Sequence, residues 1–382
     1  MVIYGKYIYK NPTKSLVAFD YNELCEIFNV IEKWRKDSKK SYKNYNFAKY
    51  LVGYLSYEAG VILQGYLHKE HSLFNIAKDL ESKLKDSKMP LAYFRFFNKR
   101  VKFKYSKINN FINKKLDIID SLDYQKYKIG FNKAKEFISQ GDTYQVNFTQ
   151  EITLESNKHI NDFMLFNVLQ GKQNTRFKAF VENKYIKVLS FSPELFFKLK
   201  GNKIKLQPMK GTANRASKES KKALKKDSKN RSENVMIVDL LRNDLSKIAK
   251  INTLKVTKLF KILSLPSLYQ MVSNIKARLR KKCTLLDIFK ALFPSGSITG
   301  APKLETMKII YDLENRHRGI YCGALGVVSR KNATFSIPIR TLFCNNGEKV
   351  FLYGVGSGIV WDSTLKDEFS ELELKCKFLD SM

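Results

Sequence analysis

Two polar residues set in apolar segments are the first candidates for chemistry. Lys210 follows Met209 and precedes Gly211 in PMKGTANR, and Glu194 lies among Phe and Leu residues in SFSPELFF. A lysine amine attacks carbon only in its neutral form, which is scarce at neutral pH, so burial or nearby cations would have to favour that form. A carboxyl group in an apolar setting can keep its proton and act as a general acid. The alternative interpretation is an exposed turn residue at both positions.

A hairpin could bring these two residues together. Glu194 lies in a strand-like segment at 184–199, and a second segment at 202–208 leads to Lys210. A turn at Gly201 and Asn202 would pair the two strands antiparallel and place their far ends side by side. An acid and a nucleophile would then face the same space.

A set of carboxylates forms the next candidate site. Glu233 precedes an expected helix at 235–249, while Glu368, Glu371 and Lys375 have the spacing that places them on one helix face. Carboxylates with room for water suit Mg²⁺, which prefers oxygen ligands. An exposed face with salt bridges is the alternative, because nothing local in the sequence brings Glu233 and Glu371 together.

Glycines and one arginine complete the list of candidates. The glycine-rich segments are GSITGAPK at 296–303 and YGVGSGIV at 353–360, and neither has the spacing of a nucleotide-binding loop. Exposed backbone N–H groups in such segments can bind carboxylates or phosphates. Arg340 is expected within the apolar strand segment SIPIRTL, where it needs a partner, and a carboxylate is the natural one. The two histidines of HKEH at 68–71 are not expected to bind a metal, because no third ligand is evident.

Apolar periodicity and turn residues predict the elements that must position these side chains. Strands are expected at 51–60 with a turn at Gly60, and at 143–154, 184–199, 202–208, 319–329, 334–344 and 349–360. Helices are expected at 123–140, ended by Gly141, at 235–249, at 273–279, from 303 through Ile310, and at 365–379, capped by Thr364 with Asp367. Series of strands with long helices between them predict an α+β fold, with antiparallel sheets layered with helices.

Composition excludes several classes of protein. The chain has 382 residues, of which 44% are hydrophobic and 27% charged, which is too apolar for intrinsic disorder. No apolar stretch has the length of a membrane span, so no membrane association is expected. Five cysteines stand far apart with no CxxC pair, which favours a reducing cytoplasm over a disulfide scaffold.

The charge balance alone does not identify a function. Lys and Arg number 69 against 36 Asp and Glu, giving a formal net charge of +33. Such a surplus attracts anions of every kind, including nucleic acid, and a basic nucleic-acid-binding protein is a remote alternative. The basic residues are spread along the whole chain, so a compositional bias is the preferred interpretation and nucleic acid is not an expected partner.

Taken in order, the segments resemble the chorismate-utilising enzyme family. The resemblance covers about residues 120–380 and includes GDTYQVNFTQ, SFSPELFF, PMKGTANR, RSENVMIVDLLRNDLSKIA, FPSGSITGAPKLETMKIIYDLE, YCGALG, IPIRTL, GVGSGIVWDS and EFSELELK. It implies the chorismate-binding fold of anthranilate synthase component I. A catalytic domain at 116–382 is expected, with 1–115 as a variable N-terminal part integrated into the fold.

Within this family Lys210 distinguishes between members. Anthranilate and isochorismate synthases typically carry Ala at this place, whereas the enzymes that make 4-amino-4-deoxychorismate carry Lys. The resemblance implies that Lys210 attacks C2 of chorismate, that Glu194 protonates the departing 4-hydroxyl, and that ammonia then displaces the lysine. An anthranilate or isochorismate synthase that tolerates Lys210 is the alternative within the family.

The resemblance also assigns roles to the other candidates. It implies Mg²⁺ held by Glu233 and Glu371 with Glu368 in support. It implies contacts to the substrate from eight residues: Arg340, Tyr321, Gly211, Ser297, Thr299, Gly356, Gly358 and Lys375.

The expected partners are chorismate and a second protein. The chain contains no recognisable glutaminase, so ammonia is expected from a separate glutamine amidotransferase subunit. Two positions depart from relatives: Gln270 stands where anthranilate synthases have His, and Asn230 stands where some relatives have Glu.

Overall fold

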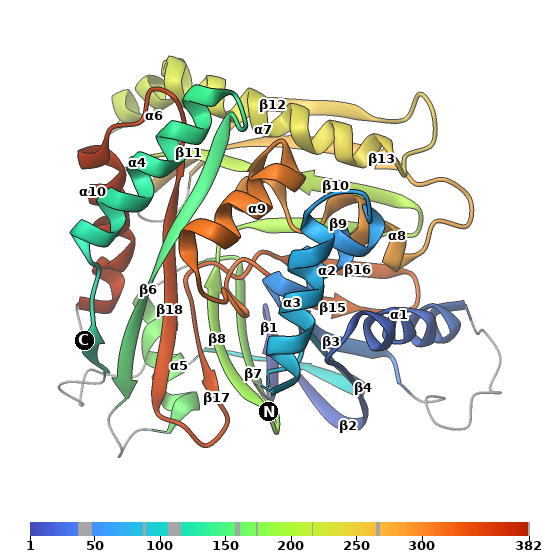
Figure 1. Ribbon diagram of the computed structural model, residues 1–382. Coiled ribbons are helices and arrows are strands. Elements are labelled where there is room, and N and C mark those ends of the chain that lie inside the picture. Colours follow the sequence, from blue (N-terminus) through green and yellow to red (C-terminus); the bar gives the residue numbers. More distant parts are fainter. Residues whose placement is uncertain are drawn as a thin grey trace.

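The computed structural model describes residues 1–36, 48–86, 89–105, 116–156, 161–172, 175–215, 217–264 and 268–380. Within them, one hydrogen-bonded sheet system of 18 strands is combined with helices (Figure 1), which confirms the α+β prediction. The helices are α1 (Tyr21–Lys36), α2 (Tyr57–Leu67), α3 (Leu73–Asp86), α4 (Tyr124–Gln140), α5 (Asp162–Lys172), α6 (Lys218–Lys226), α7 (Ser228–Ser246), α8 (Leu285–Leu292), α9 (Lys303–Glu314) and α10 (Leu365–Asp380), with a 3-10 turn at Gly296–Ile298.

The strands come from every part of the described chain and pair antiparallel. They are β1 (Val2–Tyr4), β2 (Tyr7–Ala18), β3 (Tyr50–Leu55), β4 (Ala92–Lys102), β5 (Leu116–Asp120), β6 (Gln145–Ser156), β7 (Phe177–Glu182), β8 (Ile186–Ser192), β9 (Leu195–Lys200), β10 (Lys203–Gln207), β11 (Met209–Asn214), β12 (Lys255–Ser264), β13 (Leu268–Arg278), β14 (Gly300–Ala301), β15 (Ala324–Val328), β16 (Asn332–Ser336), β17 (Thr341–Asn345) and β18 (Val350–Ile359). The N-terminal strands are part of this system, because β3 pairs with β15 and β1 pairs with β7. The division of the chain at residue 115 stays a prediction.

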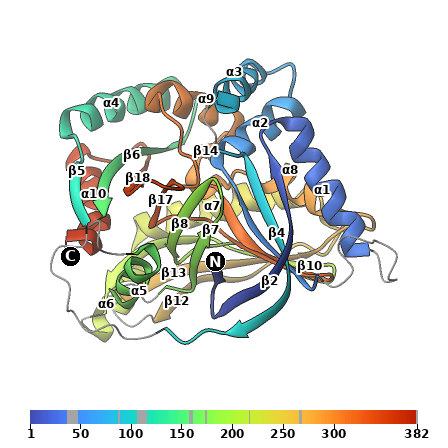
Figure 2. The same ribbon diagram turned by 90° about the horizontal axis from the view of Figure 1, so that it is seen from below.

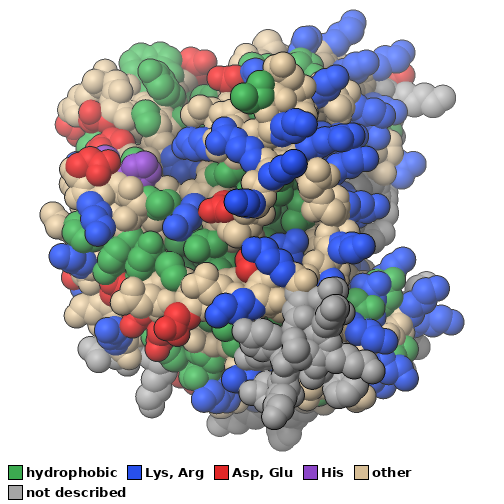
Figure 3. Space-filling model, turned by 90° about the vertical axis from the view of Figure 1, so that its right-hand side faces the viewer, with side chains coloured by type: hydrophobic (Ala, Val, Ile, Leu, Met, Phe, Trp, Pro, Cys, Tyr) green, Lys and Arg blue, Asp and Glu red, His purple; other side chains and the backbone are tan. Residues whose placement is uncertain are grey.

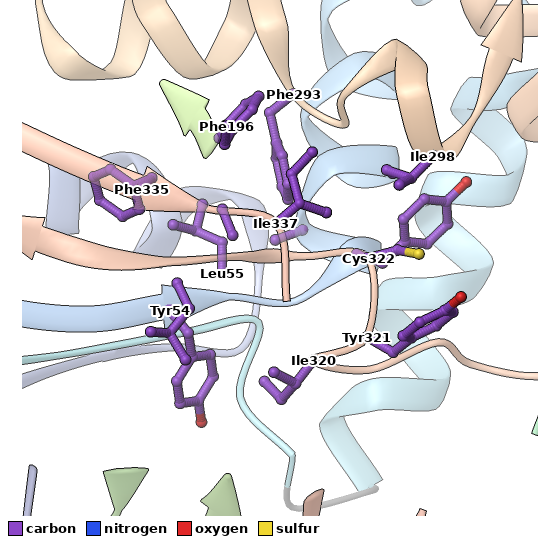
Figure 4. Packing of buried hydrophobic residues seen from close by; sticks show 14 of the residues in the cluster. Tyr54, Leu55, Phe196, Phe293, Ile298, Ile320, Tyr321, Cys322, Phe335 and Ile337 are labelled. Carbon is purple, nitrogen blue, oxygen red and sulfur yellow. The ribbon is translucent and has the colours of Figure 1, made fainter. Parts of the chain in front are cut away.

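Helices α2, α3, α4 and α9 lie along one side of the strands (Figures 1 and 2). The loop at 293–302 leads from α8 into α9 and contains the segment GSITGAP. Behind this loop an aromatic cluster fills the core, in which Phe196 packs on Phe293 with ring centroids 5.8 Å apart. Figure 4 shows these two rings beside Ile337. Burial of several large aromatic side chains stabilises the backbone on which Glu194 and Ser297 are carried.

Several local predictions are confirmed. The helix α4 ends at Gly141, which adopts the left-handed conformation with φ +85°. Strands β9 and β10 pair antiparallel across the turn that contains Gly201. The hydroxyl of Thr364 accepts from the N–H of Asp367 at 3.2 Å and donates to its carboxylate at 2.8 Å, as a capping residue does.

Three local predictions are wrong, each for a tertiary reason. Residues 273–279 are not helical: 273–278 belong to β13, which pairs with β10, β11 and β12, and Leu279 forms an isolated bridge with Ala249. Gly60 is not in a turn but within α2, where a Cβ would lie 2.5 Å from Pro294. Arg340 is not inside a strand: it lies between β16 and β17 with φ +53°.

The helix expected at 235–249 is displaced. It begins earlier, at Ser228, because Asp227 accepts a capping hydrogen bond from the N–H of Asn230 at 2.7 Å, and it ends at Ser246. Glu233 therefore lies within the second turn of α7 rather than before its start. None of the helices in the described ranges is long and apolar enough to cross a membrane.

Candidate active site

Lys210 lies on β11 where the pairing with β13 shifts register, between Met209, which pairs with Val272, and Thr212, which pairs with Gln270. Gly211 follows with φ +79°, and a Cβ there would lie 2.6 Å from the side-chain oxygen of Asn230. Only glycine combines that backbone conformation with the close approach of α7. The Lys210 Nζ lies 3.5 Å from Glu233 Oε2, so α7 supplies the carboxylate nearest to the amine.

Glu194 lies in the connection between β8 and β9 and is 7% exposed. Its Oε1 accepts from the Ser297 hydroxyl at 2.8 Å. Burial raises the pKa of Glu194 to about 7, although the Ser297 hydrogen bond and the ammonium groups of Lys210 and Lys375 oppose the rise. A buried carboxyl that titrates near neutral pH has the property a general acid needs.

The Lys210 amine faces a part of β18 that has no side chains, because glycines occupy it. A Cβ on Gly358 would lie 3.0 Å from Lys210 Nζ, and one on Gly356 would lie 2.4 Å from the methyl group of Thr149. The Lys375 ammonium donates to the Gly356 carbonyl at 2.6 Å. Helix α10 is therefore tied to the same strand that faces Lys210.

Helix α10 presents two of the predicted carboxylates in different environments. Glu371 is half exposed and pairs with Lys375 at 2.6 Å. Although partial burial opposes ionisation, Lys375 and Lys210 outweigh it and hold the pKa of Glu371 below its ordinary value. Glu368 is buried and accepts from the Ser363 hydroxyl at 2.6 Å, so it braces the start of the helix.

The donor set on α7 and α10 fits a hydrated magnesium ion. Within the described ranges no three His, Cys, Asp or Glu side chains gather closely enough to hold a metal by themselves. Mg²⁺ is commonly bound through one or two carboxylates, with waters and substrate oxygens completing its shell. Glu233 and Glu371 both lie within electrostatic reach of Lys210, and each is partnered by an ammonium group that a cation could replace.

Tyr321 and Arg340 come from other segments and lie near the β18 residues Gly354 and Tyr353. The Tyr321 ring packs on Gly354, where a Cβ would lie 2.3 Å from it. Burial lowers the pKa of the Arg340 guanidinium, with Tyr353 close enough to oppose the change. The Tyr353 hydroxyl donates to the Lys375 carbonyl at 3.1 Å, which links this group to α10.

The hydroxyl of Thr299 is used inside its own loop. It donates to the Ser295 carbonyl at 3.0 Å, and the Thr299 carbonyl accepts from the N–H of Asn147 at 2.7 Å. Thr299 thus fixes the path of the loop from which Ser297 reaches Glu194.

Gln145 is a site residue that the sequence interpretation missed. It is fully buried, and neither atom of its amide has a hydrogen-bond partner in the described part of the chain. Its Nε2 would lie 3.2 Å from a Cβ on Gly358, the same point that lies 3.0 Å from Lys210 Nζ. Buried amides are almost always paired, so an unpaired one beside the amine indicates a place for a polar ligand atom. The only signal in the sequence was a polar residue inside the strand segment YQVNF.

The two departures from relatives border Lys210. The Gln270 side chain donates to the Gly211 carbonyl at 2.8 Å, and Asn230 packs against Gly211 from α7. The side-chain amides of Gln270 and Asn230 thus both contact Gly211, the residue that follows Lys210.

A buried ion pair joins the loop of Ser297 to β6. Arg318 is 1% exposed and binds Glu314 at 2.6 Å, and it also donates to the carbonyls of Ile298 at 2.8 Å and Asn147 at 2.6 Å. Replacing Arg318 with leucine would leave a carboxylate and two carbonyls buried without this partner. We expect a loss of about 3–5 kcal/mol in the free energy of unfolding, measured with urea.

Arg242→Leu is the matched control for this prediction. Arg242 also pairs with a carboxylate a few residues before it, Asp239 at 2.9 Å, but both side chains are about half exposed or more. Its replacement is expected to cost less than about 1 kcal/mol. Equal effects of the two substitutions would contradict the structural role of Arg318.

Comparisons with known proteins show the family to which the chain is similar. A family model described as chorismate binding enzyme matches residues 5–381. The chain is 37% identical over 253 residues to aminodeoxychorismate synthase component 1 of Escherichia coli (strain K12), which covers 65% of this chain and 55% of that protein. It is 34% identical over 253 residues to anthranilate synthase component 1 of Aquifex aeolicus (strain VF5), covering 65% of this chain and 50% of that protein. The chain thus matches about half the length of these curated relatives.

The fold has a close counterpart among solved structures. The crystal structure of anthranilate synthase component I from Streptococcus pneumoniae TIGR4 matches with a TM-score of 0.77 at 21% identity, covering 98% of this chain and 91% of that one. This likeness confirms the expected fold. Because the family model covers nearly the whole sequence, the protein belongs to the chorismate-binding enzyme family.

Proposed function

We propose that this protein is an aminodeoxychorismate synthase component I, which converts chorismate and ammonia into 4-amino-4-deoxychorismate and water on the route to p-aminobenzoate and folate. The observation that supports this most is Lys210, whose amine faces the bare backbone of Gly358 while the protonatable Glu194 lies nearby. The curated relative from Escherichia coli bears this name.

The arrangement supports a reaction in two displacements. In the first, the neutral Lys210 amine forms a bond to C2 of chorismate, both ring double bonds shift by one position, and the C4–O bond breaks, so that the 4-hydroxyl leaves as water with the proton of Glu194. In the second, ammonia bonds to C4, both double bonds shift back, and the C2–lysine bond breaks. The proton lost by ammonia restores Glu194, so Lys210 and Glu194 both return to their starting states.

Gln145 is proposed to position ammonia for the second displacement. Its amide lies beside the point that Lys210 faces, and the amide oxygen is an acceptor without a hydrogen-bond partner in the described chain. Replacing Gln145 with leucine removes this acceptor. We expect ammonia-dependent turnover to fall about 10²-fold, as when one positioned polar group is lost from an active site.

The same substitution has an opposite expected effect on stability. Because a buried amide without partners is costly, Gln145→Leu is expected to leave the free energy of unfolding unchanged or to raise it by about 1 kcal/mol. Urea unfolding and initial rates on the same preparation test both statements. A variant that is destabilised and fully active would contradict them.

Glu233 and Glu371 are proposed to hold Mg²⁺, with Glu368 supporting the helix that carries Glu371. A bound Mg²⁺ would supply positive charge opposite the ring carboxylate of chorismate. Contacts to the substrate are proposed from the eight residues that the family resemblance assigned. Glu233 and Glu371 would then exchange their ammonium partners for the metal when substrate binds.

Ammonia is proposed to come from a separate glutamine amidotransferase. The name component 1 in the curated relatives supports a second component. With the purified chain alone we expect ammonium, but not glutamine, to support turnover. Adding a glutamine amidotransferase that co-purifies with the chain is expected to make glutamine effective. Failure to recover such a protein in a pull-down, with no activity from glutamine in its presence, would contradict the partner proposal.

Anthranilate synthesis is the second candidate, because the relative from Aquifex aeolicus has that name. Product analysis separates the two. Chromatography with mass detection should show 4-amino-4-deoxychorismate, which keeps its enolpyruvyl group. Anthranilate is aromatic and has lost that group as pyruvate, and its formation would replace the proposal.

A further inference from the structure

A basic cavity lies away from the candidate active site. It has a volume of about 510 Å³ and is bounded by the C-terminal ends of α2 and α7, the connection between β13 and α8, and one face of α8. Cavities of this size are typical of small-ligand sites. Figure 3 shows that Lys and Arg side chains gather on the side of the molecule where Figure 1 places α8.

The charge of the cavity lining is strongly unbalanced. Five Lys and Arg residues contribute to it: Lys247, Arg280, Lys281, Lys282 and Lys290. Asp287 is the single carboxylate among the lining residues, and it caps α8 by accepting from the N–H and the hydroxyl of Thr284, each at 2.8 Å. Cations gathered around a cleft attract an anion more strongly than the same charges spread over a surface.

The remaining wall is apolar. Leu67, Ile248 and Ala291 line the cavity between the charged groups. A bound inorganic ion would leave these apolar side chains exposed to water. An organic ligand would bury them, and this burial would contribute favourably to the free energy of binding. The lining therefore favours an anion with an apolar part.

Two sets of contacts connect the cavity to the loop that carries Ser297. Gln64, which lines the cavity, donates to the carbonyls of Lys290 at 2.8 Å and Phe293 at 2.7 Å. Lys247 pairs with Asp244 at 3.5 Å, and Asp244 pairs with the buried Lys303 at 2.5 Å. Both ends of the loop 293–303 are thus held by groups at or next to the cavity.

We propose that this cavity binds a small organic molecule carrying two negative charges and an apolar body, and that its occupancy restrains the loop 293–303. The bound anion sits among Lys281, Lys282 and Arg280, and its apolar part covers Ile248 and Ala291. Because Gln64 binds the loop directly and Lys247 is connected to it through Asp244 and Lys303, a ligand that orders these two side chains is expected to order the loop as well.

Phenyl phosphate is the probe, with inorganic phosphate beside it, in calorimetric titrations of the full chain at low ionic strength. We expect saturable binding of phenyl phosphate to one site per chain, and clearly weaker binding of inorganic phosphate. The variant Lys281→Glu/Lys282→Glu should bind at least about tenfold more weakly. Both lysines are exposed at the cavity rim, so the fold should tolerate the change.

Lys250→Glu/Lys255→Glu is the matched control, since it makes the same change in charge at exposed positions that do not line the cavity. It should bind phenyl phosphate as the wild type does, apart from the small general effect of net charge. Equal weakening in both variants, no binding, or equal affinity for phosphate and phenyl phosphate would overturn the proposal.

Hydrogen–deuterium exchange tests the proposal that an occupied cavity restrains the loop 293–303. Phenyl phosphate should slow exchange of the backbone N–H groups at 295–301 in the wild type and not in the Lys281→Glu/Lys282→Glu variant. Unchanged exchange under saturating ligand would show that the cavity is not coupled to the loop. Neither readout involves turnover, so the outcome does not depend on the proposed function.

Discussion

Replacing Lys210 with alanine is expected to reduce formation of 4-amino-4-deoxychorismate by about 10³-fold or more, because the variant has no amine to form the bond to C2. Glu194, Gln145 and the glycines of β18 remain in place. Chorismate should therefore still bind with an affinity within a few fold of the wild type. Initial rates and equilibrium binding, measured on the same preparation, separate the loss of chemistry from the loss of binding.

Lys203→Ala is the matched control. Lys203 is exposed on the neighbouring strand β10, so its removal also deletes one positive charge without reaching the site. It should retain wild-type rates. Full activity in Lys210→Ala would keep the fold and the family and reject the covalent role of the lysine.

Replacing Glu194 with glutamine is the second large expected effect. The glutamine oxygen can still accept from Ser297, so the loop should keep its position, but the side chain no longer donates a readily lost proton. General acids contribute roughly 10²–10⁴-fold, and we expect a loss of turnover in that range. Unchanged activity would exclude Glu194 as the acid.

The dependence of turnover on pH gives a separate test of Glu194. Since the pKa of Glu194 is raised to about 7, the fraction that holds a proton falls as the pH passes through that value. The turnover rate of the wild type is therefore expected to fall as the pH rises above about 7, because Glu194 loses the proton that it must donate. The residual activity of Glu194→Gln should lack this decrease.

Stability should depend on pH through the same carboxyl. Its pKa is about 7 in the folded protein, against an ordinary value of 4.5, so the folded state binds the proton more tightly than the unfolded state does. The free energy of unfolding should fall as the pH rises from about 4.5 to about 7, by at most about 3 kcal/mol. The difference between wild type and Glu194→Gln in urea unfolding at the two pH values isolates this effect.

Local patterns in the sequence predicted much of the site. The hairpin through Gly201 forms as predicted and brings Leu195, next to Glu194, opposite Gln207, since a glycine turn between two strand-like segments depends on few distant contacts. Lys210 follows three residues later and is close enough for its charge to act on Glu194. The face of α10 shared by Glu371 and Lys375 likewise follows from helical spacing alone, and the two side chains pair at 2.6 Å.

What the sequence could not predict depends on distant contacts. Residues 268–278 form a strand because three other strands pair with it, a tertiary effect that overrides the local helical pattern. Gln145 is separated from Lys210 by many elements along the chain, and only the pairing of β6 with β18 brings its amide to Gly358. Local sequence patterns likewise could not predict that Glu233 of α7 and Glu371 of α10 both lie near Lys210.

The excess of positive charge does not by itself favour a nucleic-acid partner. The basic cavity beside α8 has a volume of about 510 Å³ and an apolar wall, which suits a small anion with an apolar part. Binding of nucleic acid would be strongly weakened by salt and indifferent to chorismate. Such behaviour would support the alternative interpretation, a basic nucleic-acid-binding protein.

The most direct test of the central claim is mass spectrometry of the intact protein mixed with chorismate and Mg²⁺ in the absence of ammonia and glutamine. The account predicts a species heavier than the free chain by the mass of chorismate less one water, mapped by proteolysis to Lys210. Ammonium should discharge this species to 4-amino-4-deoxychorismate, and Lys210→Ala should not form it. Turnover of chorismate with ammonium, with no adduct at any time in the wild type and none mapped to Lys210, would contradict the account.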